Sequence, residues 1–202
     1  MTLLAACAPS GAATTPPTRA AREAAPLDPG PRPPEGWPGF PLRLETAPEG
    51  LRRLRELAAR PPALPLPPPP AIDGSRDPAA LERWVGVLYV PWVERRSERL
   101  ARAGEARRSL RDESDAVRAL GAALHGHLLL ATADAVRRAG EALEGEARAA
   151  LSAPARPYRR AAREAFDVCY ALATAAGPAL DGWRRACGER LDALPPRAPG
   201  AR

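Results

Sequence analysis

The 202-residue sequence contains no lysine, asparagine or glutamine, and aromatic residues make up only 4% of it. Strands favour aromatic and β-branched side chains. The hydrophobic 45% of this chain is instead carried mostly by alanine and leucine, which favour helices. The composition therefore argues against a β-sheet protein and predicts closely packed helices.

Motifs of the common enzyme classes are also missing. The sequence has no phosphate-binding glycine loop, nucleophile elbow or Cys-x-x-Cys pair. On a helix, the side chains of His125 and His127 would point about 200° apart, whereas a helical zinc pair needs a spacing of three or four. Asp112, Glu113 and Asp115 lie at an expected turn, where helix capping accounts for them. We expect no metal, no cofactor and no enzymatic activity.

The net charge of +6 is spread thinly along the chain, although all basic residues are arginines. Nucleic-acid binding normally needs basic residues clustered on one face. We interpret the arginine-rich groups as solvated surfaces; the alternative is contact with anionic lipids or nucleic-acid phosphates. These groups are Arg95, Arg96, Arg99, Arg102, Arg107, Arg108 and Arg111, then Arg156, Arg159, Arg160 and Arg163.

Prolines divide the chain, because 18 of the 26 precede Ser75. We interpret residues 8–76 as a Pro/Ala-rich linker with a short helix at about 47–60 and a polyproline II rod at 61–70. The rod is expected to be a spacer; the alternative is a ligand for an aromatic-lined groove. The linker's large apolar side chains can dock on the domain as an extended arm. They are Trp37, Phe40, Leu42 and Leu44.

Residues 77–194 carry apolar side chains at helical spacing and predict a helical bundle. The first long helix starts at Asp77-Pro78 and is kinked at Pro91. A turn is placed at residues 109–115, with an unbroken helix as the alternative. The second helix runs from Val117 to Leu151. The third helix starts near Tyr158 and ends before Gly177-Pro178, and a last helix runs to Leu194.

The predicted fold class is thus all-α: an antiparallel bundle of three to four long helices behind a Pro-rich, largely disordered N-terminal tether. Residues 195–202 are expected to form a disordered tail. Apolar stretches at 84–93 and 119–133 are interpreted as buried helix rather than membrane spans, because the first is too short and the second is interrupted by histidines.

Residues 4–7 read Leu-Ala-Ala-Cys and are followed by a flexible Ala/Pro/Thr stretch. This segment resembles the lipobox of bacterial lipoproteins. The resemblance implies that residues 1–7 end a signal segment, that Cys7 carries the lipid, and that the membrane is a partner. Ala8 after the cysteine implies the outer membrane. A signal peptide also needs a charged region and an apolar region, so translation is expected to start upstream of Met1; the alternative is a chance match.

The remaining cysteines, Cys169 and Cys187, are separated by 18 positions. On one straight helix they would lie roughly 27 Å apart, too far for a disulfide. If the chain folds back at Gly177-Pro178, they lie nearly opposite each other. We therefore predict a hairpin closed by a Cys169–Cys187 disulfide; the alternative is two free thiols on a kinked helix.

The sequence as a whole favours a non-enzymatic envelope lipoprotein that presents a helical bundle for structural or protein-interaction purposes. The alternative is a cytoplasmic, arginine-rich helical protein that binds nucleic acid or a protein partner.

Overall fold

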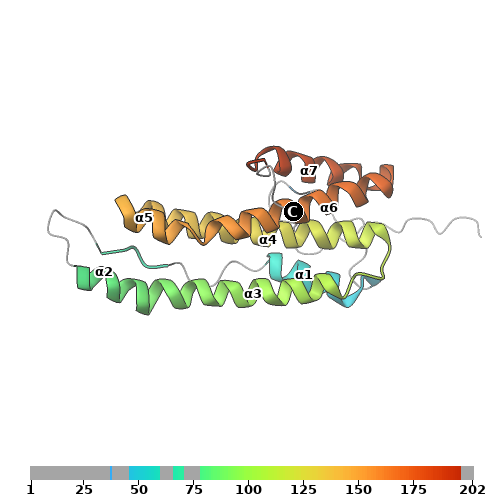
Figure 1. Cartoon of the computed structure of the whole chain (residues 1–202). Coiled ribbons are helices and arrows are strands. Elements are labelled where there is room, and N and C mark those ends of the chain that lie inside the picture. Colours follow the sequence, from blue (N-terminus) through green and yellow to red (C-terminus); the bar gives the residue numbers. More distant parts are fainter. Residues whose placement is uncertain (1–36, 38–45, 60–65, 71–77, 197–202) are drawn as a thin grey trace, which may run out of the picture.

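The computed structural model describes Trp37 and residues 46–59, 66–70 and 78–196, and every regular element in them is a helix (Figure 1). This confirms the all-α bundle. The helices are α1 (Glu49–Ala59), α2 (Pro78–Trp84), α3 (Val90–Arg108), α4 (Asp115–Glu141), α5 (Gly145–Ser152), α6 (Ala155–Ala175) and α7 (Asp181–Asp192). A π-helical turn (Val85–Tyr89) joins α2 to α3, and a 3₁₀ turn (Pro178–Leu180) precedes α7.

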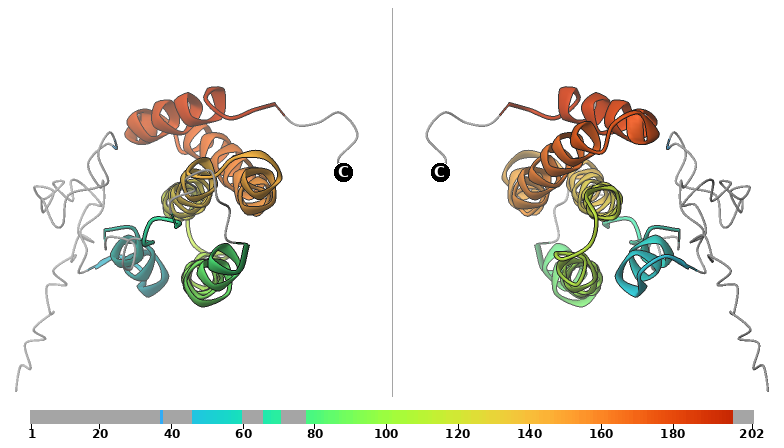
Figure 2. Two further views of the ribbon diagram at one scale, coloured as in Figure 1. Left: turned by 90° about the vertical axis from the view of Figure 1, so that its left-hand side faces the viewer. Right: turned by 90° about the vertical axis from the view of Figure 1, so that its right-hand side faces the viewer.

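Helix α4 is the central element of the bundle. It packs against α1, α3, α5 and α6, and viewed end-on it lies between α3 and the α6–α7 pair (Figure 2). About half of its 27 residues are buried, including Leu120, Leu124 and Leu128. By length and composition alone α4 is apolar enough to cross a membrane, but most of its apolar window is buried inside the protein. The prediction of a buried helix here agrees with this packing.

The turn expected at residues 109–115 is present. Helix α3 ends at Arg108 and α4 begins at Asp115, so the two helices run antiparallel (Figure 1). Ser114 is the N-cap of α4, and its hydroxyl accepts a hydrogen bond from the Val117 backbone N–H at 3.4 Å. The cap is therefore a serine, and of the three carboxylates for which capping was expected only Asp115 lies in the first turn of α4.

Pro91 does not end its helix, because the π-helical turn accommodates it. The Val90 backbone N–H donates to the Val85 carbonyl, a bond that spans five residues instead of four. Proline lacks an N–H and its ring crowds the preceding turn of an α-helix. Widening that turn relieves the crowding and lets α3 continue for 19 residues.

The expected second helix, from Val117 to Leu151, is in fact two helices. Helix α4 ends at Glu141, Leu143 is buried in the connection, and α5 starts at Gly145. Gly145 has a φ of +56°, a left-handed conformation that favours glycine and breaks the helix. The periodic apolar pattern continues across the break, which is why the sequence predicted one helix.

Helix α1 packs inside the core, so its predicted place in the linker is wrong. Its Leu51 and Leu54 side chains are 1% and 0% exposed, and α1 packs against both α3 and α4. An Arg99 guanidinium N–H donates to the Leu57 carbonyl and ties α3 to this helix. The packed body therefore includes residues that precede the predicted domain boundary at residue 77.

Close approach of α4 and α6 yields a stability prediction. A Cβ at Gly126 would lie 2.7 Å from Phe166 Cε1, and the Phe166 ring is fully buried, so moving it would disturb the packed core. Gly126→Ala should therefore lower the free energy of unfolding by about 1–3 kcal/mol, measured by urea denaturation.

Gly104→Ala in α3 is the matched control, because its Cβ would meet only ordinary contacts at 3.6 Å or more. This variant should gain up to about 1 kcal/mol from helix propensity. A Gly126→Ala variant as stable as Gly104→Ala would contradict the close approach.

Candidate functional site

The C-terminal helices form a hairpin closed by a disulfide. Gly177, with a φ of +81°, reverses the chain between α6 and α7. Cys169 and Cys187 are bonded to each other, with their Cα atoms 6.3 Å apart, and both are fully buried. Of the two alternatives that the sequence left open at Gly177-Pro178, the structure has the hairpin.

Trp37 docks on this hairpin. Its ring centroid lies 5.1 Å from that of Trp183 on α7 and 6.3 Å from that of Phe166 on α6. The Arg190 guanidinium carbon lies 3.9 Å from the Trp37 ring centroid, a cation–π contact. Trp37 is 7% exposed. It therefore acts as a contact point of the linker, as expected of an extended arm; Phe40, Leu42 and Leu44 lie outside the described residues.

The two histidines face different neighbours. The His127 ring meets Trp37 edge-on at 5.9 Å, whereas His125 Nδ1 lies 3.4 Å from an Arg107 guanidinium nitrogen. Burial, helped by nearby arginines, lowers the pKa of both imidazoles to about 4, so both are neutral at pH 7. A neutral Nδ1 can accept from Arg107. Among the residues that the structure describes, no group of three metal-ligating side chains comes together.

The α2–α3 junction builds a second aromatic site. In a regular α-helix, residues five apart point about 140° away from each other. The five-residue hydrogen-bond spacing of the π turn instead brings Trp84 and Tyr89 onto one face, with ring centroids 5.7 Å apart. Trp92 continues the stack at 6.1 Å from Tyr89. We call Trp84, Tyr89 and Trp92 the aromatic ladder.

Residues 66–70, the described part of the predicted polyproline rod, lie against this ladder. We call them the proline segment. The Trp84 indole N–H donates to the Pro67 carbonyl at 3.1 Å, and Leu66 packs against the same apolar cluster. Tyr89 donates its hydroxyl to the Leu151 carbonyl at 2.6 Å and so fixes the ladder to α5. The proline segment is thus seated on the bundle, which the spacer interpretation did not anticipate.

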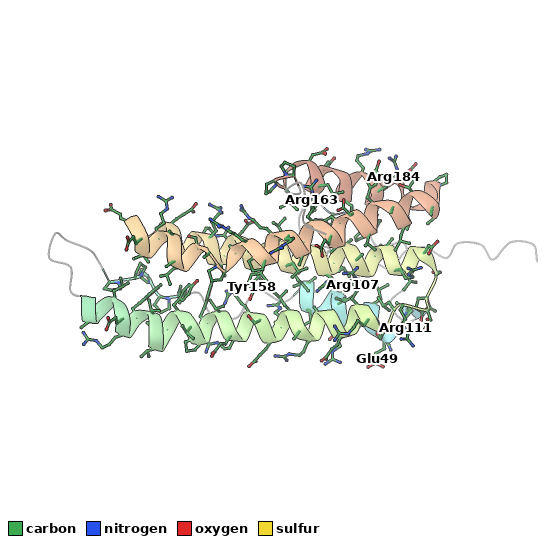
Figure 3. All side chains as sticks on the ribbon, viewed as in Figure 1. Glu49, Arg107, Arg111, Tyr158, Arg163 and Arg184 are labelled. Atoms are coloured by element: carbon green, nitrogen blue, oxygen red, sulfur yellow. A yellow bond between two sulfur atoms is a disulfide. The ribbon has the colours of Figure 1, made fainter. Side chains whose placement is uncertain are left out.

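Several arginines of the two predicted surface groups make structural contacts. Arg159 pairs with Asp134 at 3.0 Å and joins α6 to α4. Arg163 donates to three carbonyls at the end of α7, those of Leu191, Leu194 and Pro195 (Figure 3). Leu191 lies in the last turn of α7 and the other two residues follow the helix, so the guanidinium caps this end of α7. Sequence alone could not find these roles, because the partners lie 25–32 positions away.

The predicted carboxylates remain on the surface. Asp112 pairs with Arg111 and Asp115 with Arg118, each at 3.0 Å, and all four side chains are substantially exposed. These pairs support the turn and offer no buried acid. Cys7 lies outside the described residues.

The disulfide predicts a redox-sensitive stability. Closing an 18-residue separation should stabilise the fold by about 3 kcal/mol. Cys187→Ser, or reduction under denaturing conditions followed by refolding with reductant, should lower the urea midpoint accordingly. Intact mass under non-reducing conditions should be two hydrogens below the thiol form. Two free thiols in protein purified from an oxidising compartment would contradict the pairing.

The histidines predict a pH dependence. Their folded pKa of about 4 lies below the ordinary 6.5, so the unfolded chain binds more protons between these values. The stability that the two neutral histidines contribute is fully present above pH 6.5. It is lost as the pH falls toward 4, by at most roughly 3 kcal/mol of unfolding free energy for each histidine. Urea denaturation at pH 7 and pH 5 should show this loss, and the His125→Gln/His127→Gln variant should show a smaller one. An equal loss in both proteins would exclude the histidines as its source.

No protein-family model matches this chain, and neither a curated protein nor a solved structure matches it. Function must therefore be inferred from the chain's own residues.

Proposed function

We propose that this protein is a non-enzymatic, lipid-anchored protein of the bacterial cell envelope. Cys7 carries the lipid, and the disulfide-closed helical bundle is presented to a structural or protein partner. Two features of the chain support this proposal, the Leu-Ala-Ala-Cys segment at residues 4–7 and the pairing of the other two cysteines.

The observation that carries the proposal is the Cys169–Cys187 pairing. Disulfides persist in oxidising compartments such as the periplasm and are rare in the bacterial cytoplasm. The chain has three cysteines, so this pairing leaves only Cys7 unpaired. An odd cysteine in an exported protein calls for a separate role. Lipid attachment, which the lipobox resemblance implies, supplies that role.

The docked Trp37 sets the reach of the anchor. Because Trp37 is held in the core, only the residues between Cys7 and Trp37 add to the distance between the lipid and the bundle. The stretch between Cys7 and Trp37 comprises residues 8–36. Fully extended, these residues span at most roughly 100 Å. The bundle would therefore lie within that distance of the lipid surface. A tether made of all residues 8–76 would have allowed a larger distance.

Attachment through one residue has a direct test. The gene is expressed from its own locus with a C-terminal tag, as wild type and as Cys7→Ser, and cells are separated into membrane and soluble fractions. Wild type should be in the membrane fraction and Cys7→Ser should be released. Mass spectrometry should find acyl chains on the N-terminal fragment of wild type only.

Cys187→Ser is the control, because it removes a cysteine without touching the anchor and should stay with the membrane. Cys7→Ser that remains as membrane-bound as wild type would overturn the anchor. A soluble wild-type protein with free thiols and salt-sensitive retention on DNA would favour the cytoplasmic alternative.

A further inference from the structure

The proline segment occupies the aromatic ladder in a way that resembles intermolecular peptide recognition. Proline-rich strands are bound by aromatic grooves because they are stiff, lack N–H groups and expose carbonyls as acceptors. Here the Trp84 indole N–H supplies the donor and Pro67 supplies the carbonyl. Pro67 and Pro68 themselves remain exposed. The segment is therefore held along one edge and is not enclosed by the core.

The segment leaves part of its groove unfilled. A cavity of about 360 Å³ lies between the prolines and the bundle. Trp92, at the next position of the ladder, lines this cavity, and its buried indole N–H finds no acceptor anywhere in the described part of the chain. A buried donor without an acceptor is unfavourable, because it has lost its hydrogen bonds to water and gained none in return. The groove thus holds two indole donors, of which the chain's own segment uses one.

The charge of the cavity restricts what fits it. Arg96 stacks over the Trp92 ring with its guanidinium carbon 3.6 Å from the ring centroid, and Arg138 of α4 lines the same cavity. No carboxylate is among the described residues that line it. Burial and the neighbouring Arg99 and Arg95 lower the Arg96 pKa to about 10, which leaves it cationic at pH 7. An acceptor-rich strand with an acidic residue is therefore the complementary ligand.

We propose that the groove formed by the aromatic ladder and α4 binds a proline-rich segment of another protein, with an acidic residue beside the prolines, in competition with the chain's own proline segment. The partner strand gives carbonyls to both the Trp84 and the Trp92 indole N–H groups. Its acidic side chain faces Arg138, which lines the cavity from α4. This site does not depend on the lipid anchor, so the two proposals stand or fall separately.

Covalent linkage makes the chain's own segment an effective competitor. A short tethered segment acts at an effective concentration on the order of millimolar. A partner must therefore displace this segment. The partner's apparent affinity is its intrinsic affinity multiplied by the fraction of molecules whose groove is free. Weakening the chain's own segment should raise affinity for the partner without any change in the groove.

The test uses the full chain as wild type and with Pro67→Gly, Pro68→Gly and Pro69→Gly combined, which makes the competing segment flexible. The probe is a fluorescein-labelled peptide with the sequence Ala-Leu-Pro-Leu-Pro-Pro-Pro-Pro-Asp, and binding is followed by fluorescence anisotropy. The triple variant should bind it at least about tenfold more tightly than wild type. A peptide with alanine in place of every proline is the control and should bind weakly to both.

Two further variants in the triple-glycine background locate the site. Trp84→Phe and Trp92→Phe keep an aromatic ring and remove one indole donor each, so each should weaken peptide binding about tenfold. Circular dichroism establishes that each variant keeps its helical content. An alanine peptide that binds as well as the proline peptide would overturn the proposal, as would equal binding by wild type and the triple variant. A wild-type dimer that the triple-glycine variant no longer forms would assign the groove to a second copy of this chain instead.

Discussion

Burial of α4 is the constraint on which the rest of the structure depends. An apolar helix of this length is stable in water only if other helices cover it, and α1, α3, α5 and α6 do so. Alanine and glycine on its surface let the neighbours approach closely, as where Phe166 of α6 packs over Gly126. Helix α1 takes part in covering α4, although the composition of the region around α1 is typical of a linker.

The two ends of the bundle are held by different chemistry. At one end the covalent Cys169–Cys187 bond closes the α6–α7 hairpin, and Trp37 packs onto it in contact with Arg190 of α7. At the other end the aromatic ladder forms a separate apolar cluster with Ala133, Val136 and Ala155. Each end also receives a piece of the N-terminal linker, Trp37 or the proline segment. The linker is therefore partly a structural component of the bundle, and its attachments limit how far an anchored bundle can extend.

Much of the helical core could be predicted from the sequence because the information is local. Leucine and alanine recurring at each turn identified the helices, the polar residues 109–115 marked a turn, and the cysteines at nearly equal distances from Gly177-Pro178 indicated the hairpin. What could not be predicted depends on contacts between distant residues. The break at Gly145 leaves the apolar period intact, so periodicity could not detect it. The capping by Arg163 and the Trp84–Pro67 hydrogen bond join segments that have no shared pattern.

The sequence by itself determined that the chain is helical and where most helices begin and end. It also determined that two of the three cysteines are placed to pair with each other, which leaves Cys7 over. Helix propensity, capping and proline geometry act over a few residues, so they can be read directly. Only the tertiary structure decided which helix is central, that α1 and Trp37 belong to the core, and that a proline-rich stretch lies on an aromatic groove. Those outcomes depend on which apolar faces meet in space, and residues close along the chain do not specify that.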